Sequence, residues 1–177
     1  MQKIFAAFIL SLTVFLSGCA SVTIADYKDD KPKLDLATYF NGKVDGWGMV
    51  QDRSGKVTRR FTVEIDCVWR GNEGVLDESF VWSDGKLEKR IWKITKQGDN
   101  YIGTAGDIVG EAIGVASGPA LQWRYVLDLP VDNTTYKVNM DDWMYLIDDK
   151  TLSNRTVMTK FGVQLAEITI FFRKRGA

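Results

Sequence analysis

In Phe61-Thr62-Val63-Glu64-Ile65-Asp66-Cys67-Val68-Trp69, apolar side chains occupy every second position. A period of two places alternate side chains on opposite faces of a β-strand, so this stretch predicts a strand with one buried face. The same alternation runs through 121–129 and stops at Pro130. Apolar segments of similar length follow at 136–140, 143–147, 152–158 and 165–172.

Turn-forming residues separate these segments and decide the fold class. Gly, Asn, Asp and Ser gather at 52–55, 70–74, 83–85, 97–100, 132–133 and 148–150. Together they predict about nine or ten short strands joined in sequence order, with one helical turn near 35–40. A large sheet tends to close because closure removes exposed edges. We therefore predict an all-β fold, an antiparallel meander closed or nearly closed into a barrel of about 8–10 strands.

A hairpin centred on residues 83–85 brings a carboxylate opposite a guanidinium. With Gly85 in the left-handed conformation, a three-residue loop sets Glu78 opposite Arg90, on one face with aromatic residues such as Trp92. If that face is interior, the pair is costly to break from one side, by about 3–5 kcal/mol. If it is exterior, the pair contributes less than about 1 kcal/mol. The sequence leaves both options open.

Small residues dominate 103–118, with glycines at 103, 106, 110, 114 and 118. Acidic residues inside this stretch and a proline behind it argue against a helix, and each interior glycine would cost a helix about 1 kcal/mol. As extended chain, the stretch places Gly110 and Gly114 on one side. They either pack against large neighbours such as Trp123 and Trp143, or they form a wall that admits a ligand.

The composition excludes several classes of function. Lys and Arg number 23, Asp and Glu also number 23, and no long basic run indicates nucleic-acid binding. The sequence contains no histidine, which excludes Ser-His-Asp and Cys-His catalysis within the chain and removes the commonest metal ligand. Cys67 lies among alternating apolar residues, so we predict a buried core cysteine, with a reactive thiol as the alternative.

The N-terminal sequence predicts a targeting signal. Lys3 precedes the mostly apolar run Ile4–Leu16, which is the layout of a secretory signal and is too short to span a membrane comfortably. The residues Leu16-Ser17-Gly18-Cys19 resemble the lipobox of bacterial lipoproteins. That resemblance implies that Cys19 is acylated and becomes the mature N-terminus, and Ala20 after it implies the outer membrane, facing the periplasm. The alternative is a plain signal peptide with a chance cysteine.

These observations divide the chain into three parts. We predict a lipoprotein signal peptide over 1–18, a polar tether over 19–35 and a single β-barrel domain over 36–177. The tether shows no hydrophobic period, and its flexible residues would span on the order of 20 Å. The remaining length suits one domain with a sizeable core.

Paired acids give only a weak indication of chemistry. Neighbouring strand residues point to opposite faces, and neither Asp141-Asp142 nor Asp148-Asp149 falls within a calcium-loop pattern. We interpret the first pair as structural and the second as a hairpin turn. The remaining candidates for acid–base work have no nucleophile or cofactor motif beside them; they are Glu78, Asp66, Asp107, Glu111 and Asp142.

The C-terminal half resembles a known family. The segment 141–149, followed by Asn154-Arg155, Lys160-Phe161-Gly162 and 171–174, is similar to the uncharacterised lipoproteins of Gram-negative bacteria grouped as domain of unknown function 3833. The resemblance extends from Leu36 onward, through Gly42, Gly46-Trp47-Gly48, Gly110-Glu111-Ala112 and Trp123-Arg124-Tyr125. No activity is assigned to the family. Its members are often encoded near fatty-acid-modifying enzymes, which implies a role in lipid metabolism.

A more distant resemblance is to the lipocalins. Their first strand carries Gly-x-Trp, and a late Arg covers that Trp at the closed end of the barrel. Here Gly46-Trp47 lacks the intervening residue, and Arg173 would be the counterpart. The resemblance implies a lipocalin-like barrel.

We therefore expect a lipid-anchored barrel that binds a fatty acid or phospholipid at the periplasmic face of the outer membrane. The candidate ligand-binding residues are Glu78, Arg90, Trp92, Gly110, Gly114, Trp123 and Trp143. We expect no catalytic residue, cofactor or metal, and no protein partner is indicated. The alternative is a structural or adaptor lipoprotein whose barrel is filled; an enzyme acting on acyl chains comes third. An enclosed cavity of several hundred Å³ would favour binding.

Overall fold

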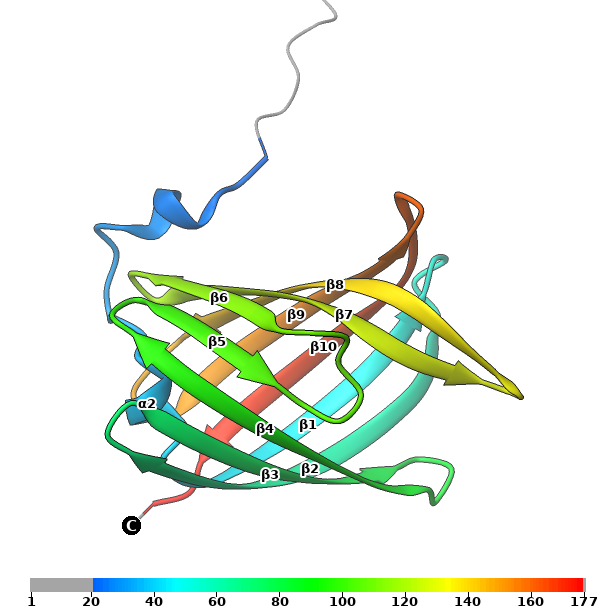
Figure 1. Cartoon of the computed structure of the whole chain (residues 1–177), viewed down its shortest axis with the longest axis horizontal. Coiled ribbons are helices and arrows are strands. Elements are labelled where there is room, and N and C mark those ends of the chain that lie inside the picture. The colour runs from blue at the N-terminus through cyan, green and yellow to red at the C-terminus, as the bar shows by residue number, and fades with distance from the viewer. Residues whose placement is uncertain (1–20, 177) are drawn as a thin grey trace, which may run out of the picture.

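A closed barrel of ten antiparallel strands makes up the computed structural model, which describes residues 21–176 (Figure 1). Each strand pairs with the next along the chain, and the last pairs with the first. The strands are β1 (Gly42–Asp52), β2 (Val57–Arg70), β3 (Glu73–Trp82), β4 (Leu87–Gln97), β5 (Asn100–Thr104), β6 (Ala112–Ser117), β7 (Ala120–Val131), β8 (Thr134–Leu146), β9 (Thr151–Lys160) and β10 (Val163–Lys174). The predicted all-β meander is confirmed. Among the described residues, no helix has the length and apolar character needed to cross a membrane.

Two strand boundaries differ from those predicted. The apolar segments at 136–140 and 143–147 belong to one strand, β8, which continues through the paired acids because one of them points inward and the other outward. Strand β7 continues past Pro130, which pairs with Thr135 beside the hairpin turn. No neighbouring strand other than β8 pairs with that part of β7, and proline is tolerated at such an edge.

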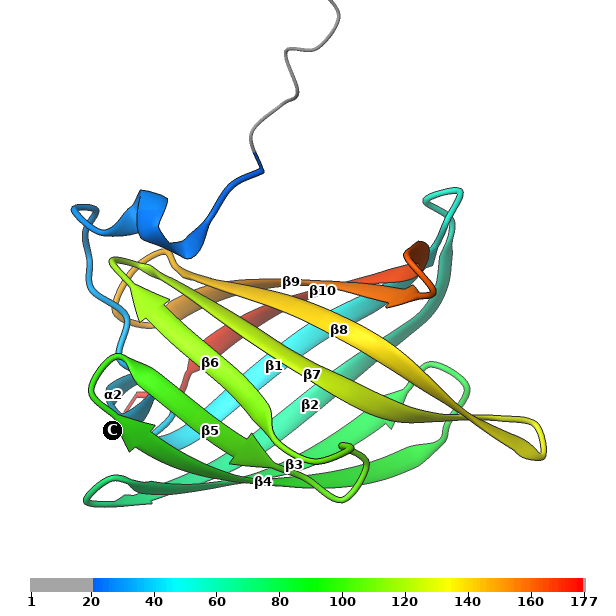
Figure 2. The same cartoon turned by 45° about the horizontal axis from the view of Figure 1, so that its top comes forward.

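A short helix, α2 (Leu36–Tyr39), closes one end of the barrel, and the hairpins after β1, β3, β7 and β9 lie at the other (Figures 1 and 2). The Asp35 side chain caps the helix by accepting a hydrogen bond from the Ala37 amide at 2.8 Å. Lys96 Nζ lies 2.5 Å from Asp35 Oδ2. Trp69 Nε1 donates to the Phe40 carbonyl at 2.8 Å. These contacts fasten the helical turn to β2 and β4.

Part of the segment predicted as a polar tether lies against the outside of the barrel (Figure 2). A 3-10 turn, η2 (Ile24–Tyr27), places the Tyr27 ring 5.6 Å from that of Tyr145. Leu34 is only 1% exposed, and its amide donates to the Gly118 carbonyl at 2.8 Å. Tyr27 and Leu34 therefore attach this segment to the barrel, although its composition is mostly polar. Residues 1–20, with the predicted signal peptide and Cys19, lie outside the described residues.

The backbone of Gly118 permits this close approach. Its φ is +53°, and a Cβ there would lie 1.9 Å from the carbonyl oxygen of Tyr27. Glycine is therefore required at the point where η2 passes over the turn between β6 and β7.

Candidate functional site

A partly enclosed cavity of about 130 Å³ lies inside the barrel, next to α2. One water needs roughly 10–15 Å³ on the same measure, so the cavity has room for several waters or for a slender part of a ligand. It is smaller than the several hundred Å³ expected of an open ligand barrel. Most of its wall is apolar, and the aromatic residues in it are Phe40, Phe61, Trp69, Phe80, Trp82, Trp92, Trp123, Tyr125 and Phe172.

The predicted hairpin places an ion pair in this cavity. Its register is confirmed, since Glu78 on β3 lies directly opposite Arg90 on β4. Both side chains are mostly buried and line the cavity, so the interior option holds. The nearest guanidinium nitrogen of Arg90 lies 3.9 Å from Glu78 Oε2.

Asp107 is the closer partner of Arg90. Its Oδ2 lies 3.0 Å from Arg90 Nε, an ion pair whose angle is not that of a hydrogen bond. Asp107 belongs to the loop 105–111, which lies along β7 where no strand pairs with it. Val109 N donates to the Val126 carbonyl, and Asp128 N donates to the Asp107 carbonyl, both at 2.9 Å.

A second carboxylate enters the cavity from β8. Asp142 is 7% exposed and accepts a hydrogen bond from Asn154 Nδ2 on β9. Thr156 Oγ1 donates to Asn154 Oδ1 at 3.4 Å. Asp141 points outward and accepts from Gln122 Nε2 at 2.7 Å, so the two acids lie on opposite faces as expected. We call Glu78, Arg90, Asp107, Asp142 and Asn154 the inner polar cluster.

Burial shields the acids of the inner polar cluster from water, which disfavours their charged forms. Burial raises the pKa of Glu78 to about 7, against the attraction of Arg90 and with the help of Asp107 and Asp142. Burial likewise raises the pKa of Asp142 to about 7, although hydrogen bonds from Asn154 and Thr156 favour its charged form. Both carboxyl groups therefore titrate near neutral pH.

Acids outnumber bases around the cavity. Its lining contains Glu78, Glu88 and Asp142, while Arg90 is the only cation among the described lining residues. Asp107 adds a further acid through its contact with Arg90. Glu78 Oε2 and Asp107 Oδ1 are buried without a hydrogen-bond partner in the described structure. Two donors on lining residues, Trp82 Nε1 and Arg90 Nε, are likewise buried without a hydrogen-bond partner, although Arg90 Nε faces Asp107 Oδ2 at 3.0 Å.

The structure brings together four of the seven candidate ligand-binding residues. Glu78, Arg90, Trp92 and Trp123 line the cavity, whereas Gly110, Gly114 and Trp143 do not.

Neither Gly114 nor Gly110 forms part of the cavity wall. Gly114 lies on β6 under Trp123, and a Cβ there would lie 2.2 Å from Cε3 of the indole. The packing interpretation is therefore correct for Gly114, and Gly103 contacts the same ring. The expectation of one extended chain over 103–118 was wrong, because β5 ends at Thr104. Gly110 instead lies in the loop with φ +71°, and a Cβ on it would have no other atom within 4 Å.

Trp143 points out of the barrel. Its ring stacks on Tyr145 at 6.1 Å and meets Tyr27 of η2 at the same distance. The strand alternation explains this, since Asp142 next to it takes the inward position. Trp143 therefore contributes to the docking of η2 and not to the cavity.

From the sequence, no role beside the cavity was assigned to three residues: Asn154, Thr156 and Asp107. Asn154 and Thr156 occupy inward positions of β9, between Leu152 and Met158. The alternation along this strand could therefore have predicted a polar pair on its otherwise apolar face. Asp107 reaches Arg90 only through the path of the loop, which no local pattern indicates.

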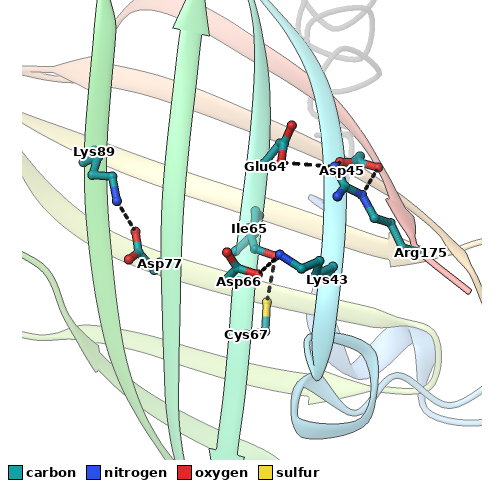
Figure 3. Close-up of polar contacts among 9 residues, drawn as sticks. All are labelled: Lys43, Asp45, Glu64, Ile65, Asp66, Cys67, Asp77, Lys89 and Arg175. Atoms are coloured by element: carbon teal, nitrogen blue, oxygen red, sulfur yellow. Dashed lines mark hydrogen bonds and ion pairs between the residues drawn. The ribbon is translucent and has the colours of Figure 1, made fainter. Parts of the chain in front are cut away.

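Two other predictions concern residues outside the cluster. Cys67 is 3% exposed, and burial raises the pKa of its thiol to about 12, so it is a core cysteine (Figure 3). Trp47 is half exposed on the outer face, opposite Phe171 in the pairing of β1 with β10, while Arg173 lies opposite Asp45. Trp47 thus lies outside the barrel and not at a closed end of its interior, where the lipocalin resemblance would place it. Within residues 21–176, no three acidic or thiol side chains lie together as ligands for a metal ion.

Comparisons with known proteins agree with this architecture. The family described as "Protein of unknown function (DUF3833)" matches residues 13–174. No curated protein matches the sequence. Among solved structures, Rv2717c from M. tuberculosis aligns with a TM-score of 0.59 at 13% identity, covering 84% of this chain and 100% of that one.

Two further solved structures share the barrel. The S-type phycobiliprotein lyase CPES from Guillardia theta aligns with a TM-score of 0.54 at 4% identity, over 77% of this chain and 89% of that one. A protein of unknown function from the DUF3598 family of Nostoc punctiforme aligns with a TM-score of 0.56 at 11% identity. The alignment covers 88% of this chain and only 53% of the Nostoc protein, about half its length. These likenesses show a lipocalin-like barrel fold.

Proposed function

The chain belongs to the DUF3833 family of proteins of unknown function, and we propose that its barrel binds a slender hydrophobic ligand such as the acyl chain of a fatty acid or phospholipid. The observation that carries this proposal is the partly enclosed, mostly apolar cavity of about 130 Å³ inside the barrel. Aromatic walls around a few polar groups are typical of sites for small hydrophobic ligands. The polar groups here are those of the inner polar cluster.

The proposal includes the place where binding occurs. Acylation of Cys19 would hold the barrel at the periplasmic face of the outer membrane, next to a supply of lipid. Each acyl methylene in a bilayer contributes about 0.8 kcal/mol, so several chains would make the attachment effectively permanent. Ile24–Tyr27 and Leu34 contact the barrel, so few residues of the sequence separate Cys19 from it.

A filled barrel with a structural or adaptor role is the second candidate. The packing of Trp123 into the space above Gly103 and Gly114 favours it, because this indole fills volume that a larger ligand would need. An enzyme acting on acyl chains remains the third candidate, with Glu78 and Asp142 as the acids that titrate near neutral pH.

The test of binding is native mass spectrometry of the protein extracted from its own membrane, followed by titration with a fluorescent fatty acid. We expect a copurified lipid and saturable binding. A matched pair of variants locates the site: Val63→Phe fills the cavity, and Val81→Phe adds the same ring to the exposed outer face of β3. Binding lost only in Val63→Phe, with both variants folded, supports the proposal. Absence of both lipid and probe binding in the wild type favours the filled barrel.

The anchoring has a separate test. Cys19→Ser should release the folded protein from membranes into the soluble periplasmic fraction. Retention of this variant on membranes washed with high salt would contradict lipid anchoring through Cys19.

A further inference from the structure

Resting on the proposed function, we infer that the ligand's polar group, where it meets the inner polar cluster, is a hydrogen-bond donor, best as an ammonium group, and carries no negative charge. At this point of the cavity the favoured group is therefore the amine or alcohol of an aliphatic amphiphile, and a free carboxylate or phosphate is disfavoured there, while the apolar wall still accepts the acyl chain of the proposed function.

Two carboxylate oxygens of the inner polar cluster lack a hydrogen-bond partner. Glu78 is 9% exposed and lines the cavity, and its Oε2 has no hydrogen-bond partner. Oδ1 of Asp107, whose Oδ2 lies 3.0 Å from Arg90 Nε, is also buried and unpartnered. Buried polar atoms are normally hydrogen-bonded. The unpartnered donor among the described residues of the cluster, Arg90 Nε, already faces Asp107 Oδ2, so the two bare carboxylate oxygens favour a ligand group that donates.

Arg90 already faces two carboxylates of the protein. A carboxylate ligand would need this guanidinium, but Asp107 lies 3.0 Å from it and Glu78 lies 3.9 Å from it. An anion would have to displace one of these carboxylates, or would add a negative charge to the three carboxyl groups of the cluster, where water is scarce. Like charges repel strongly in such surroundings, so the cluster disfavours an anionic group beside it.

Aromatic rings line the cavity around the inner polar cluster. The guanidinium carbon of Arg90 lies 5.7 Å from the centre of the Phe80 ring, and the rings of Trp92 and Tyr125 meet edge to face at 5.6 Å. Ring faces attract cations and do not attract anions. The apolar and the acidic parts of the cavity therefore favour the same class of ligand, a chain that ends in a cation or a neutral donor.

The experiment compares three ligands with the same ten-carbon chain: decylamine, decanol and decanoate. Each displaces a neutral fluorescent probe from the intact barrel at pH 8, below its micelle concentration. We expect decylamine to bind at least roughly tenfold more tightly than decanoate, with decanol between them. Equal or tighter binding of decanoate would overturn the inference while leaving the proposed function in place. Failure of all three to bind would overturn the proposed function and this inference with it.

Two variants assign the preference to the cluster. Glu78→Gln keeps the size of the side chain and removes its charge, so the preference for decylamine over decanoate should shrink severalfold while decanol binding changes little. Glu64→Gln makes the same change on the exposed face of β2, opposite Ser79, and should leave all three affinities unaltered. An unchanged preference in folded Glu78→Gln would contradict the role of this carboxylate.

Discussion

Two neighbouring ion pairs on one hairpin show how strongly the side of a barrel wall changes what a charge does. Lys89 and Asp77 lie on the outside of β4 and β3, with side chains 69% and 40% exposed and a separation of 3.4 Å (Figure 3). Arg90 and Glu78, one residue further along each strand, point inward, and their side chains taken alone are 21% and 12% exposed. The two pairs lie at adjacent positions of the same two strands, so they differ in whether their side chains face outward or inward.

The outer pair is one of several. Lys43 with Asp66, and Arg175 with Asp45 and Glu64, lie on the same outer surface (Figure 3). Water and salt screen such pairs, so each contributes less than about 1 kcal/mol. The inner pair lacks this screening. The comparison teaches that similar residue types support solubility on one face and create a charged, ligand-sized recess on the other.

Removing the cation from each pair should give the largest contrast. Arg90→Met leaves Glu78, Asp107 and Asp142 without a counter-charge and should lower the free energy of unfolding by about 3–5 kcal/mol at pH 8. Lys89→Met should lower it by less than about 1 kcal/mol. Urea denaturation measures both. Equal, small losses would mean that the inner charges are stabilised by water or by another partner.

Titration of the inner acids should give the next largest effect. The pKa of Glu78 is about 7 in the folded protein and ordinary in the unfolded chain. Between these values the folded state holds a proton that the unfolded chain has lost, so stability falls as pH rises. The slope is about 1.4 kcal/mol per pH unit for one group, and it ends above the folded pKa.

The variant Glu78→Gln isolates this contribution. The groups facing Glu78 are Arg90, Asp107, Asp142 and Tyr125, and all remain in the variant. The stability of wild type minus that of Glu78→Gln should therefore fall by roughly 3 kcal/mol between pH 4.5 and pH 7. In Asp77→Asn, the matched change on the outer face, the fall with pH seen in the wild type should persist. A difference that is flat with pH would contradict the raised pKa of Glu78.

Packing on the two faces of β6 offers a smaller effect. Gly114→Leu drives a side chain into the Trp123 ring and should cost about 1–3 kcal/mol through overpacking. Ile113→Leu, one residue away on the exposed face, should change stability by less than about 0.5 kcal/mol. Melting curves of the two variants and the wild type measure these losses of stability. A fully stable Gly114→Leu protein would revive the interpretation of this residue as a ligand wall.

The docked N-terminal segment provides the smallest expected effect. Tyr27→Ala removes the contacts with Trp143 and Tyr145 on the outer wall and should cost about 0.5–1.5 kcal/mol. Hydrogen exchange of the Leu34 amide should accelerate, while ligand binding inside the barrel stays unchanged. Unaltered exchange at Leu34 would mean that its bond to Gly118 holds the segment without the tyrosine.

The sequence predicted those features that depend on local alternation. The strand period, the turn at Gly85 and the pairing of Glu78 with Arg90 all follow from spacing along one hairpin. The opposite orientations of Asp141 and Asp142 follow from the same rule.

Features that depend on the path of a loop could not be predicted. The stretch around Gly110 alternates like a strand, but it leaves the sheet after Thr104 and carries Asp107 to Arg90. Whether Trp143 faces inward or outward could be predicted only by recognising that two apolar segments form the single strand β8. Tyr27 and Leu34 sit in a polar segment whose docking depends on surfaces far away in the sequence.

The loop 105–111 also has a consequence for how the interior is reached. Strands β5 and β6 have 5 and 6 residues, whereas the other strands have 10 to 14, so this loop replaces part of the hydrogen-bonded wall. A bridge between Ile108 and Leu127 and the two hydrogen bonds beside it attach the loop to β7. Local opening is least costly where backbone pairing is sparse. Any movement that lifts the loop from β7 also draws Asp107 away from Arg90, so a side entrance to the barrel and the charge balance of its interior would change in the same motion.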